Sequence, residues 1–87
     1  MSPPLTAQIR MSENEPLGAR IRRLRQERGM TQDSLALKAK VDQSGLSKLE
    51  RGKGRTMGRV QLSRIASLLG MTFDDLIVGT DFQEKAE

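Results

Sequence analysis

The 87-residue sequence contains no histidine, no cysteine, no tryptophan and no tyrosine, and it has two phenylalanines. Without imidazole and thiol groups, the chain lacks the usual acid–base catalyst, thiol chemistry and the ligands of most zinc sites. It also shows no pair of carboxylates in a plausible catalytic cleft. We therefore expect a protein that is not an enzyme and that binds no metal, cofactor or small-molecule ligand.

Long apolar runs are also missing from the sequence. No stretch approaches the length of a membrane-spanning helix, and the first ten residues lack the hydrophobic core of a signal peptide. We expect no association with a membrane and a location in the cytoplasm. A chain of this length forms one domain, which buries roughly 60 to 65% of the surface that its unfolded chain exposes.

The positive charge is concentrated in the middle of the chain. The formal net charge is +4, but thirteen lysines and arginines stand against four acidic residues between Arg20 and Arg64, and both flanking parts are net acidic. A basic region of this kind suits a polyanion. A solvated helical surface would explain the charge but not its concentration in one region. Because two phenylalanines are too few for base stacking, duplex nucleic acid is favoured over single strands.

Composition divides the chain into three parts. Residues 1–16 hold all three prolines and little apolar periodicity, which predicts a flexible N-terminal arm in which Met11 is an alternative start. Residues 17–80 carry helical apolar patterns and form the predicted domain. Residues 81–87 are expected to be a polar C-terminal tail.

Apolar spacing and terminal signals predict five short helices and an all-α fold. The expected helices run from about Leu17 to Arg28, from Thr31 to the turn at Lys38–Lys40, from Asp42 to Gly52, from about Arg59 to Leu69, and from Thr72 onward. Thr31, Asp42 and Thr72 are the expected N-caps, because their side-chain oxygens can accept from the free N–H groups that open a helix. The residues expected to end helices in the left-handed conformation are Gly29, Gly52 and Gly70.

The second and third of these helices have the pattern of a helix-turn-helix. They are short, about four residues separate them, and small alanines stand where they cross. The third helix places Leu46 and Leu49 on its buried face. Its outer face carries Gln43, Ser44, Ser47 and Lys48. A row of amide, hydroxyl and ammonium groups can read base edges without repelling phosphate. We therefore interpret this segment as a recognition helix.

Side chains near the recognition helix are expected to hold the DNA backbone. Gln32 opens the second helix, where its amide and the free backbone N–H groups can meet a phosphate oxygen. The following loop supplies four cations that can clamp the backbone without reading sequence, namely Arg51, Lys53, Arg55 and Arg59. Alternatively, Gln32 is a merely exposed glutamine and any one of the loop cations is merely solvated. Most arginines of the first helix are expected to be solvated or near phosphate.

Several motifs, in order along the chain, carry a family resemblance. They are Leu24–Gln32, Leu35–Ala36, Val41–Gly52, Ile65–Ala66 with Leu69–Gly70, and Thr72–Leu76. On these motifs, the chain from Leu17 to Ile77 resembles the lambda-repressor-like helix-turn-helix family, also called the Cro/C1-type or XRE family. The resemblance implies a compact five-helix DNA-binding domain and a sequence-specific regulator of transcription, most simply a repressor that occludes a promoter.

The resemblance also implies which residues touch DNA. Gln43 and Ser44 match the main base-contacting positions, and a bidentate Gln43–adenine pair is the expected contact. Lys48 matches a further position that reaches a base, with guanine as the expected partner. Arg51 and Lys53 match contacts to the DNA backbone.

Other positions are implied to support these contacts. Gln32 matches an amide that touches phosphate and braces Gln43. Glu50 matches a carboxylate that pairs with Arg25 of the first helix, and this ion pair is structural. Removing one partner of a largely buried pair typically costs about 3 to 5 kcal/mol.

The chain departs from the family pattern in three places. Lys40 stands in the turn where glycine is usual, and a lysine there pays about 1 kcal/mol for the left-handed conformation. Gly45 lies inside the recognition helix, either as a weakness of roughly 1 kcal/mol relative to alanine or as a gap that lets the helix approach the bases. Arg59 stands where an apolar residue is common, which leaves Met57 or Val60 to fill that part of the core.

A homodimer is expected because one recognition helix reads only a few base pairs. The family's usual arrangement is a two-fold dimer on a palindrome, with half-sites about 34 Å apart. The apolar residues expected at the dimer interface are Phe73, Ile77, Val78 and Phe82. Ordinary core is the alternative, and it suits Phe73 better than the other three.

A second class of function stays open on the same fold. An antitoxin, or a factor that bridges a regulator and polymerase, would use the apolar C-terminal residues for a different protein partner. The two readings overlap, since antitoxins often bind their own promoters. Capture of such a partner without retention of DNA at low salt would favour the second reading.

Overall fold

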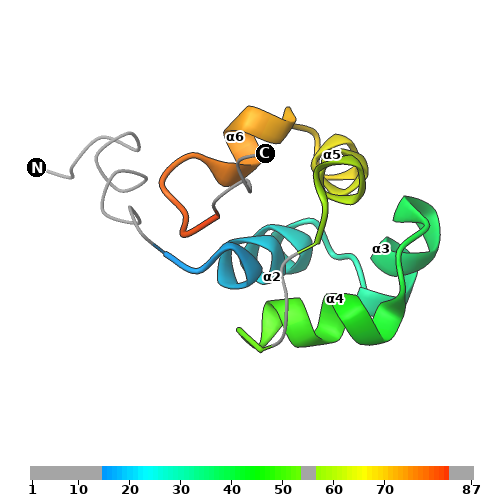
Figure 1. Ribbon diagram of the computed structural model, residues 1–87. Coiled ribbons are helices and arrows are strands. Elements are labelled where there is room, and N and C mark those ends of the chain that lie inside the picture. Colours follow the sequence, from blue (N-terminus) through cyan, green and yellow to red (C-terminus); the bar gives the residue numbers. More distant parts are fainter. Residues whose placement is uncertain (1–14, 54–56, 83–87) are drawn as a thin grey trace, which may run out of the picture.

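The computed structural model describes residues 15–53 and 57–82 and shows five helices in them (Figure 1). They are α2 (Leu17–Glu27), α3 (Gln32–Ala39), α4 (Gln43–Glu50), α5 (Arg59–Leu68) and α6 (Phe73–Ile77). Among the described residues, an isolated parallel bridge between Glu15 and Thr80 is the only β pairing. The predicted all-α fold of five helices is confirmed.

The helix ends follow the signals in the sequence. The side-chain oxygens of Thr31, Asp42 and Thr72 accept from backbone N–H groups at 3.0, 2.9 and 3.0 Å, and so cap α3, α4 and α6. Gly29, Gly52 and Gly70 have φ values of 67°, 73° and 81° after α2, α4 and α5. Capping and left-handed glycines are local effects, which is why the predicted helix ends agree closely with the observed ones.

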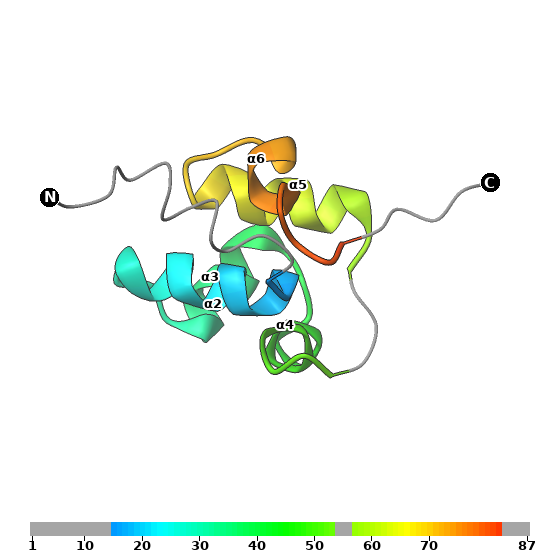
Figure 2. The same cartoon turned by 90° about the vertical axis from the view of Figure 1, so that its left-hand side faces the viewer.

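One apolar core joins the five helices. Its buried residues are Leu17, Ile21, Leu35, Ala36, Ala39, Leu46, Leu49, Leu62, Ile65, Ala66, Leu69 and Leu76. In the two views of Figures 1 and 2, α4 lies on one side of α2, and α5 with α6 lies on the other. The outer side of α4 is therefore free of other helices. None of the described helices combines the length and apolar character that crossing a bilayer requires.

Met57 fills the core position beside the start of α5. It packs against the buried cluster, whereas Val60 is 64% exposed. Of the two residues expected to fill this part of the core, it is therefore Met57, and not Val60, that does so. The Arg59 guanidinium instead lies over the Phe73 ring, with 4.5 Å between Cζ and the ring centroid.

Arg20 of α2 is buried, with 5% of its surface exposed. Its Nε donates to Glu15 Oε1 at 2.8 Å, and its Nη1 donates to the carbonyl oxygens of Leu76 and Val78. Arg20 is therefore an exception among the arginines of this helix, most of which were expected to be solvated or near phosphate. Its burial is explained by these fixed acceptors, which replace the water that a guanidinium loses.

The two ends of the described chain are joined by hydrogen bonds. The Glu15 N–H donates to the Gly79 carbonyl at 3.2 Å, and the Asp81 N–H donates to the Glu15 carbonyl at 3.1 Å. Asp81 Oδ1 accepts from the Leu17 N–H at 2.8 Å and so satisfies a free donor at the start of α2. The folded part thus includes Glu15 and Asp81, which lie outside the expected limits of 17–80.

Lys40 adopts the left-handed conformation in the turn between α3 and α4. Its φ is 58° and its ψ is 45°, and its N–H donates to the Leu37 carbonyl at 3.2 Å. The turn therefore keeps the conformation that usually takes glycine. A side chain with a Cβ atom is strained there, because Cβ approaches the following carbonyl oxygen.

Replacing Lys40 with glycine is expected to raise the free energy of unfolding by about 1 kcal/mol, because the left-handed strain is removed. Lys38→Gly is the matched control, since it removes the same charge from the last turn of α3, where the backbone is helical. There, the free energy of unfolding is expected to fall by about 1 kcal/mol, because glycine is a poor helix former. Urea denaturation measures both. A loss of stability in Lys40→Gly would contradict the strain argument.

Candidate nucleic-acid interface

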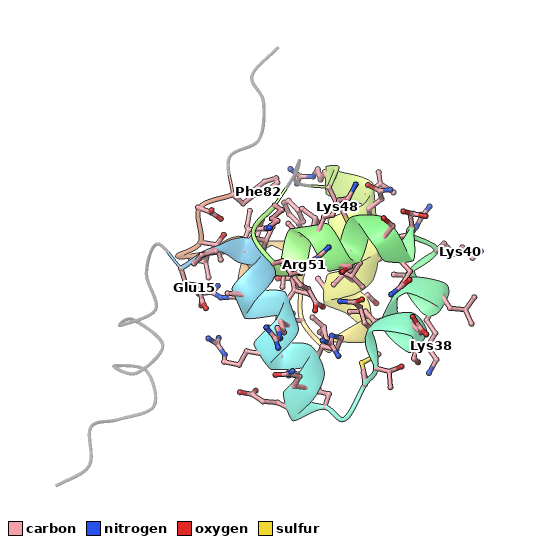
Figure 3. The ribbon with its side chains drawn as sticks, turned by 90° about the horizontal axis from the view of Figure 1, so that it is seen from below. Glu15, Lys38, Lys40, Lys48, Arg51 and Phe82 are labelled. Carbon is pink, nitrogen blue, oxygen red and sulfur yellow. The ribbon has the colours of Figure 1, made fainter. Side chains whose placement is uncertain are left out.

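The outer face of α4 is polar and uncovered. Gln43, Ser44 and Lys48 are exposed and Ser47 is partly exposed, whereas Leu46 and Leu49 are buried on the opposite face. The helical period brings the four polar residues to one side, because residues three and four apart in a helix are neighbours. Figure 3 shows Lys48 and Arg51 along this side of α4. The structure thus brings together all four of the residues expected to contact bases.

The four polar residues of this face include no carboxylate. Asp42 is at the start of α4, but its Oδ2 accepts from the Gly45 N–H at 2.9 Å. Glu50, at the other end, is buried. A helix surface with hydroxyls, an amide and cations can approach a polyanion without local repulsion.

Two glutamines connect α3 to α4. Gln43 Nε2 donates to Gln32 Oε1 at 2.9 Å, and Gln32 Nε2 donates to Glu50 Oε1 at 3.1 Å. The resemblance implied the first of these contacts. The second joins residues eighteen apart in the chain and is not among the contacts that the resemblance implied. Together, the two bonds fix the orientation of the Gln43 amide.

Arg25 and Glu50 form a bidentate ion pair between α2 and α4. Arg25 Nε and Nη2 donate to the two Glu50 carboxylate oxygens, each at 2.9 Å. The side chains are 11% and 2% exposed, and Arg25 Nη1 also donates to the Met30 carbonyl at 2.9 Å. The ion pair implied by the resemblance is therefore present. Its Glu50 carboxylate also accepts from Gln32, which in turn accepts from Gln43.

The expected backbone clamps fall into three groups. Arg51 and Lys53 are exposed directly after α4, and Arg51 Nε donates to the Ser47 carbonyl at 3.3 Å. Arg55 lies outside the described residues. Arg59 is exposed, and its guanidinium lies against the Phe73 ring of α6. Only Arg51 and Lys53 are thus described beside the outer face of α4.

The residues expected at a dimer interface are only partly free. Phe73 and Phe82 contact each other edge to face, with 5.7 Å between the ring centroids. Together with Ile77, they are partly buried against the core. Val78 is 62% exposed. Val78 is therefore the most exposed apolar residue of this group.

Comparison with known proteins agrees with this arrangement. A sequence model described as a helix-turn-helix domain matches residues 16–77. The HTH-type transcriptional regulator y4dJ of Sinorhizobium fredii, itself described as uncharacterized, is 34% identical over 71 residues, which cover 82% of this chain and 91% of y4dJ. The HTH-type transcriptional regulator DdrOP3 of Deinococcus deserti is 42% identical over 64 residues, which cover 72% of this chain and 48% of DdrOP3.

Two solved structures have a similar fold. A chain of a SinR protein/SinI protein complex matches with a TM-score of 0.66 and 31% identity, over 70% of this chain and 59% of that chain. The clp gene regulator ClgR from Corynebacterium glutamicum matches with a TM-score of 0.66 and 33% identity, over 72% of this chain and 66% of that chain. The chain thus spans about half to two thirds of DdrOP3 and of the two solved chains.

Proposed function

The chain belongs to the helix-turn-helix family of DNA-binding transcriptional regulators, and we propose that it represses transcription as a homodimer on a palindromic operator. The family consists of regulators and not of enzymes, so the expected absence of catalytic activity is confirmed. The observation that carries the proposal is the uncovered outer face of α4, whose glutamine, Gln43, is held by a hydrogen bond to Gln32.

Hydrogen-bond capacity supports Gln43 as a reader of adenine. An amide NH₂ has two N–H donors, and the Gln43 group uses one of them on Gln32. The second N–H and the Oε1 acceptor stay available, which is the pair that adenine N7 and N6 require. Ser44, Ser47 and Lys48 then contact neighbouring bases from the same face.

Gln32 is proposed to contact a phosphate. Its NH₂ group donates once to Glu50 and its Oε1 accepts from Gln43, which leaves one N–H donor. Gln32 is the first residue of α3, where free backbone N–H groups also favour an anion. The cations proposed to hold further phosphates are Arg51, Lys53, Arg55 and Arg59.

The homodimer is supported by two arguments. One α4 helix spans only a few base pairs, so a second copy is needed for a specific site, with half-sites about 34 Å apart. Val78 also leaves an apolar side chain exposed directly after Ile77, and Phe73, Ile77 and Phe82 are only partly buried. These four residues are proposed to meet their copies across a two-fold axis.

Selection of bound duplexes from a random pool is the direct test. The wild-type protein is expected to recover a two-fold symmetric motif, and Gln43→Ala is expected to lose about 1 to 3 kcal/mol of discrimination at one base pair in each half-site. Lys53→Ala is the contrast, because loss of a phosphate contact weakens all sequences alike. An unchanged ranking of operator variants with Gln43→Ala would refute the base-reading role, and an asymmetric motif would refute the palindromic dimer.

A protein-interaction role is the second candidate. It is favoured by the likeness to a chain of the SinR protein/SinI protein complex and by the exposure of Val78. An antitoxin or a bridging factor would use the C-terminal apolar residues for a different protein. Recovery of no enriched duplex at low salt, together with a stoichiometric complex that Val78→Asp disrupts, would favour this candidate over the repressor.

A further inference from the structure

The arginines of α2 differ in their partners. Three of them form ion pairs, which are Arg20–Glu15, Arg23–Glu15, Arg23–Glu27 and Arg25–Glu50, and Arg28 directly after α2 pairs with Glu27. Arg22 is exposed and pairs with no carboxylate in the part of the chain that the structure describes. Among the described residues, no carboxylate engages its guanidinium, whose five N–H donors can meet an anion.

The position of Arg22 on α2 directs it toward the end of α4. Gly18, four residues earlier, lies against the Leu49 and Glu50 backbone, and Arg25, three residues later, pairs with Glu50. Since successive helical residues turn by about 100°, Arg22 lies about 40° around the helix from Gly18. Arg23 lies about 140° from Gly18 by the same rule and belongs to another side of α2.

The end of α4 that this side of α2 faces is followed by cations. Arg51 and Lys53 are exposed directly after the C-terminal end of α4. Figure 3 shows α2 beside α4 on the face where Lys48 and Arg51 lie. Exposed cations on one side of the molecule repel one another in the free protein, and their arrangement becomes favourable when a polyanion lies across them.

We propose that Arg22 contacts a phosphate of the DNA backbone, so that α2 adds to the interface that α3, α4 and the following loop form. The inference rests on the proposed function, because it requires a duplex seated on the outer face of α4. Arg22 is a positioning contact without base specificity, since phosphates carry no sequence information directly. The ion-paired arginines of α2 are held by protein carboxylates and do not share this role.

Salt dependence of DNA binding distinguishes the two kinds of arginine. With Arg22→Gln, the slope of log K against log salt is expected to be less steep by about 1.8, the value for two phosphate contacts, one from each protomer of the proposed homodimer. The affinity at 0.1 M salt then falls about sixtyfold, for operator and unrelated duplexes alike. Arg23→Gln is the matched control, since it makes the same charge change one residue away and is expected to keep the wild-type slope.

The possible results distinguish failure of the Arg22 contact from failure of the proposed DNA-binding function. Wild-type slopes for both variants, or equal reductions in both, would overturn the role of Arg22 while DNA binding stands. A wild-type protein that binds no duplex at low salt would overturn the proposed function and the inference with it. Circular dichroism of the free variants checks that each one is folded.

Discussion

Replacing Gly18 with alanine is expected to lower the free energy of unfolding by about 3 kcal/mol or more. A Cβ atom built on Gly18 would stand 1.7 Å from the Leu49 carbonyl oxygen, 2.5 Å from its carbonyl carbon and 2.9 Å from Glu50 Cα. All three are backbone atoms, so no side-chain rotation relieves the clash, and α2 must move away from α4. Overpacking a core typically costs about 1 to 3 kcal/mol where side chains can adjust.

Gly45→Ala is the matched control for this substitution. Both glycines lie inside helices, where alanine is favoured by about 1 kcal/mol. A Cβ atom on Gly45 would meet only atoms of Asp42 and Met57, each at 3.8 Å, which is ordinary contact. Gly45→Ala is therefore expected to gain up to about 1 kcal/mol, opposite in sign to Gly18→Ala. Equal effects in urea denaturation would contradict the close helix contact.

The Gly45→Ala variant also tests whether Gly45 is a gap that lets α4 approach the bases. The nearest atoms to its missing side chain belong to the protein, from Asp42 and from Met57 before α5. Space for a methyl group exists there in the free protein. A stable Gly45→Ala protein with wild-type DNA affinity would mark this glycine as a weakness of the helix.

Replacing Arg25 with methionine is expected to cost about 3 to 5 kcal/mol of folding free energy. The substitution leaves the Glu50 carboxylate, whose side chain is 2% exposed, with Gln32 as its described hydrogen-bond donor. An uncompensated buried charge is strongly destabilising. Because small domains have a total stability of roughly 5 to 15 kcal/mol, the variant is expected to be partly unfolded at 37 °C.

Two further variants show whether the cost comes from the orphaned charge. Arg28→Met removes an exposed ion pair with Glu27 at 3.9 Å, and it is expected to cost less than about 1 kcal/mol. The double variant Arg25→Met with Glu50→Leu replaces the buried pair by apolar groups and is expected to recover much of the loss. Thermal and urea unfolding measure all three. A double variant no more stable than Arg25→Met alone would contradict this explanation.

The double variant also tests how the ion pair supports the site. Without the Glu50 carboxylate, Gln32 loses the acceptor that holds its amide, and the Gln32–Gln43 bond loses its support. Weaker discrimination between operators in a folded double variant is therefore expected. The ion pair would then contribute both to the stability of the fold and to the orientation of Gln43 on the outer face of α4.

The sequence by itself determined where the helices begin and end and which face of each is buried. Thr31, Asp42 and Thr72 cap helices whether or not the rest of the fold is known, and the periodic leucines face one side of each helix. Family membership also followed from the sequence, because ordered motifs over most of the chain are more specific than any one motif.

Apart from the Asp42 cap and the Arg25–Glu50 pair, which were expected from the sequence, tertiary structure decided what the charged side chains do. Arg20 and Arg22 look alike in the sequence, yet Arg20 is buried against Glu15 and two carbonyl groups, and Arg22 is exposed without a described carboxylate partner. The close contact at Gly18 and the Gln32–Glu50 bond also join residues that are far apart in the chain. Caps and periodicity act within one helix turn, whereas partners and close contacts depend on how helices pack, which no local pattern specifies.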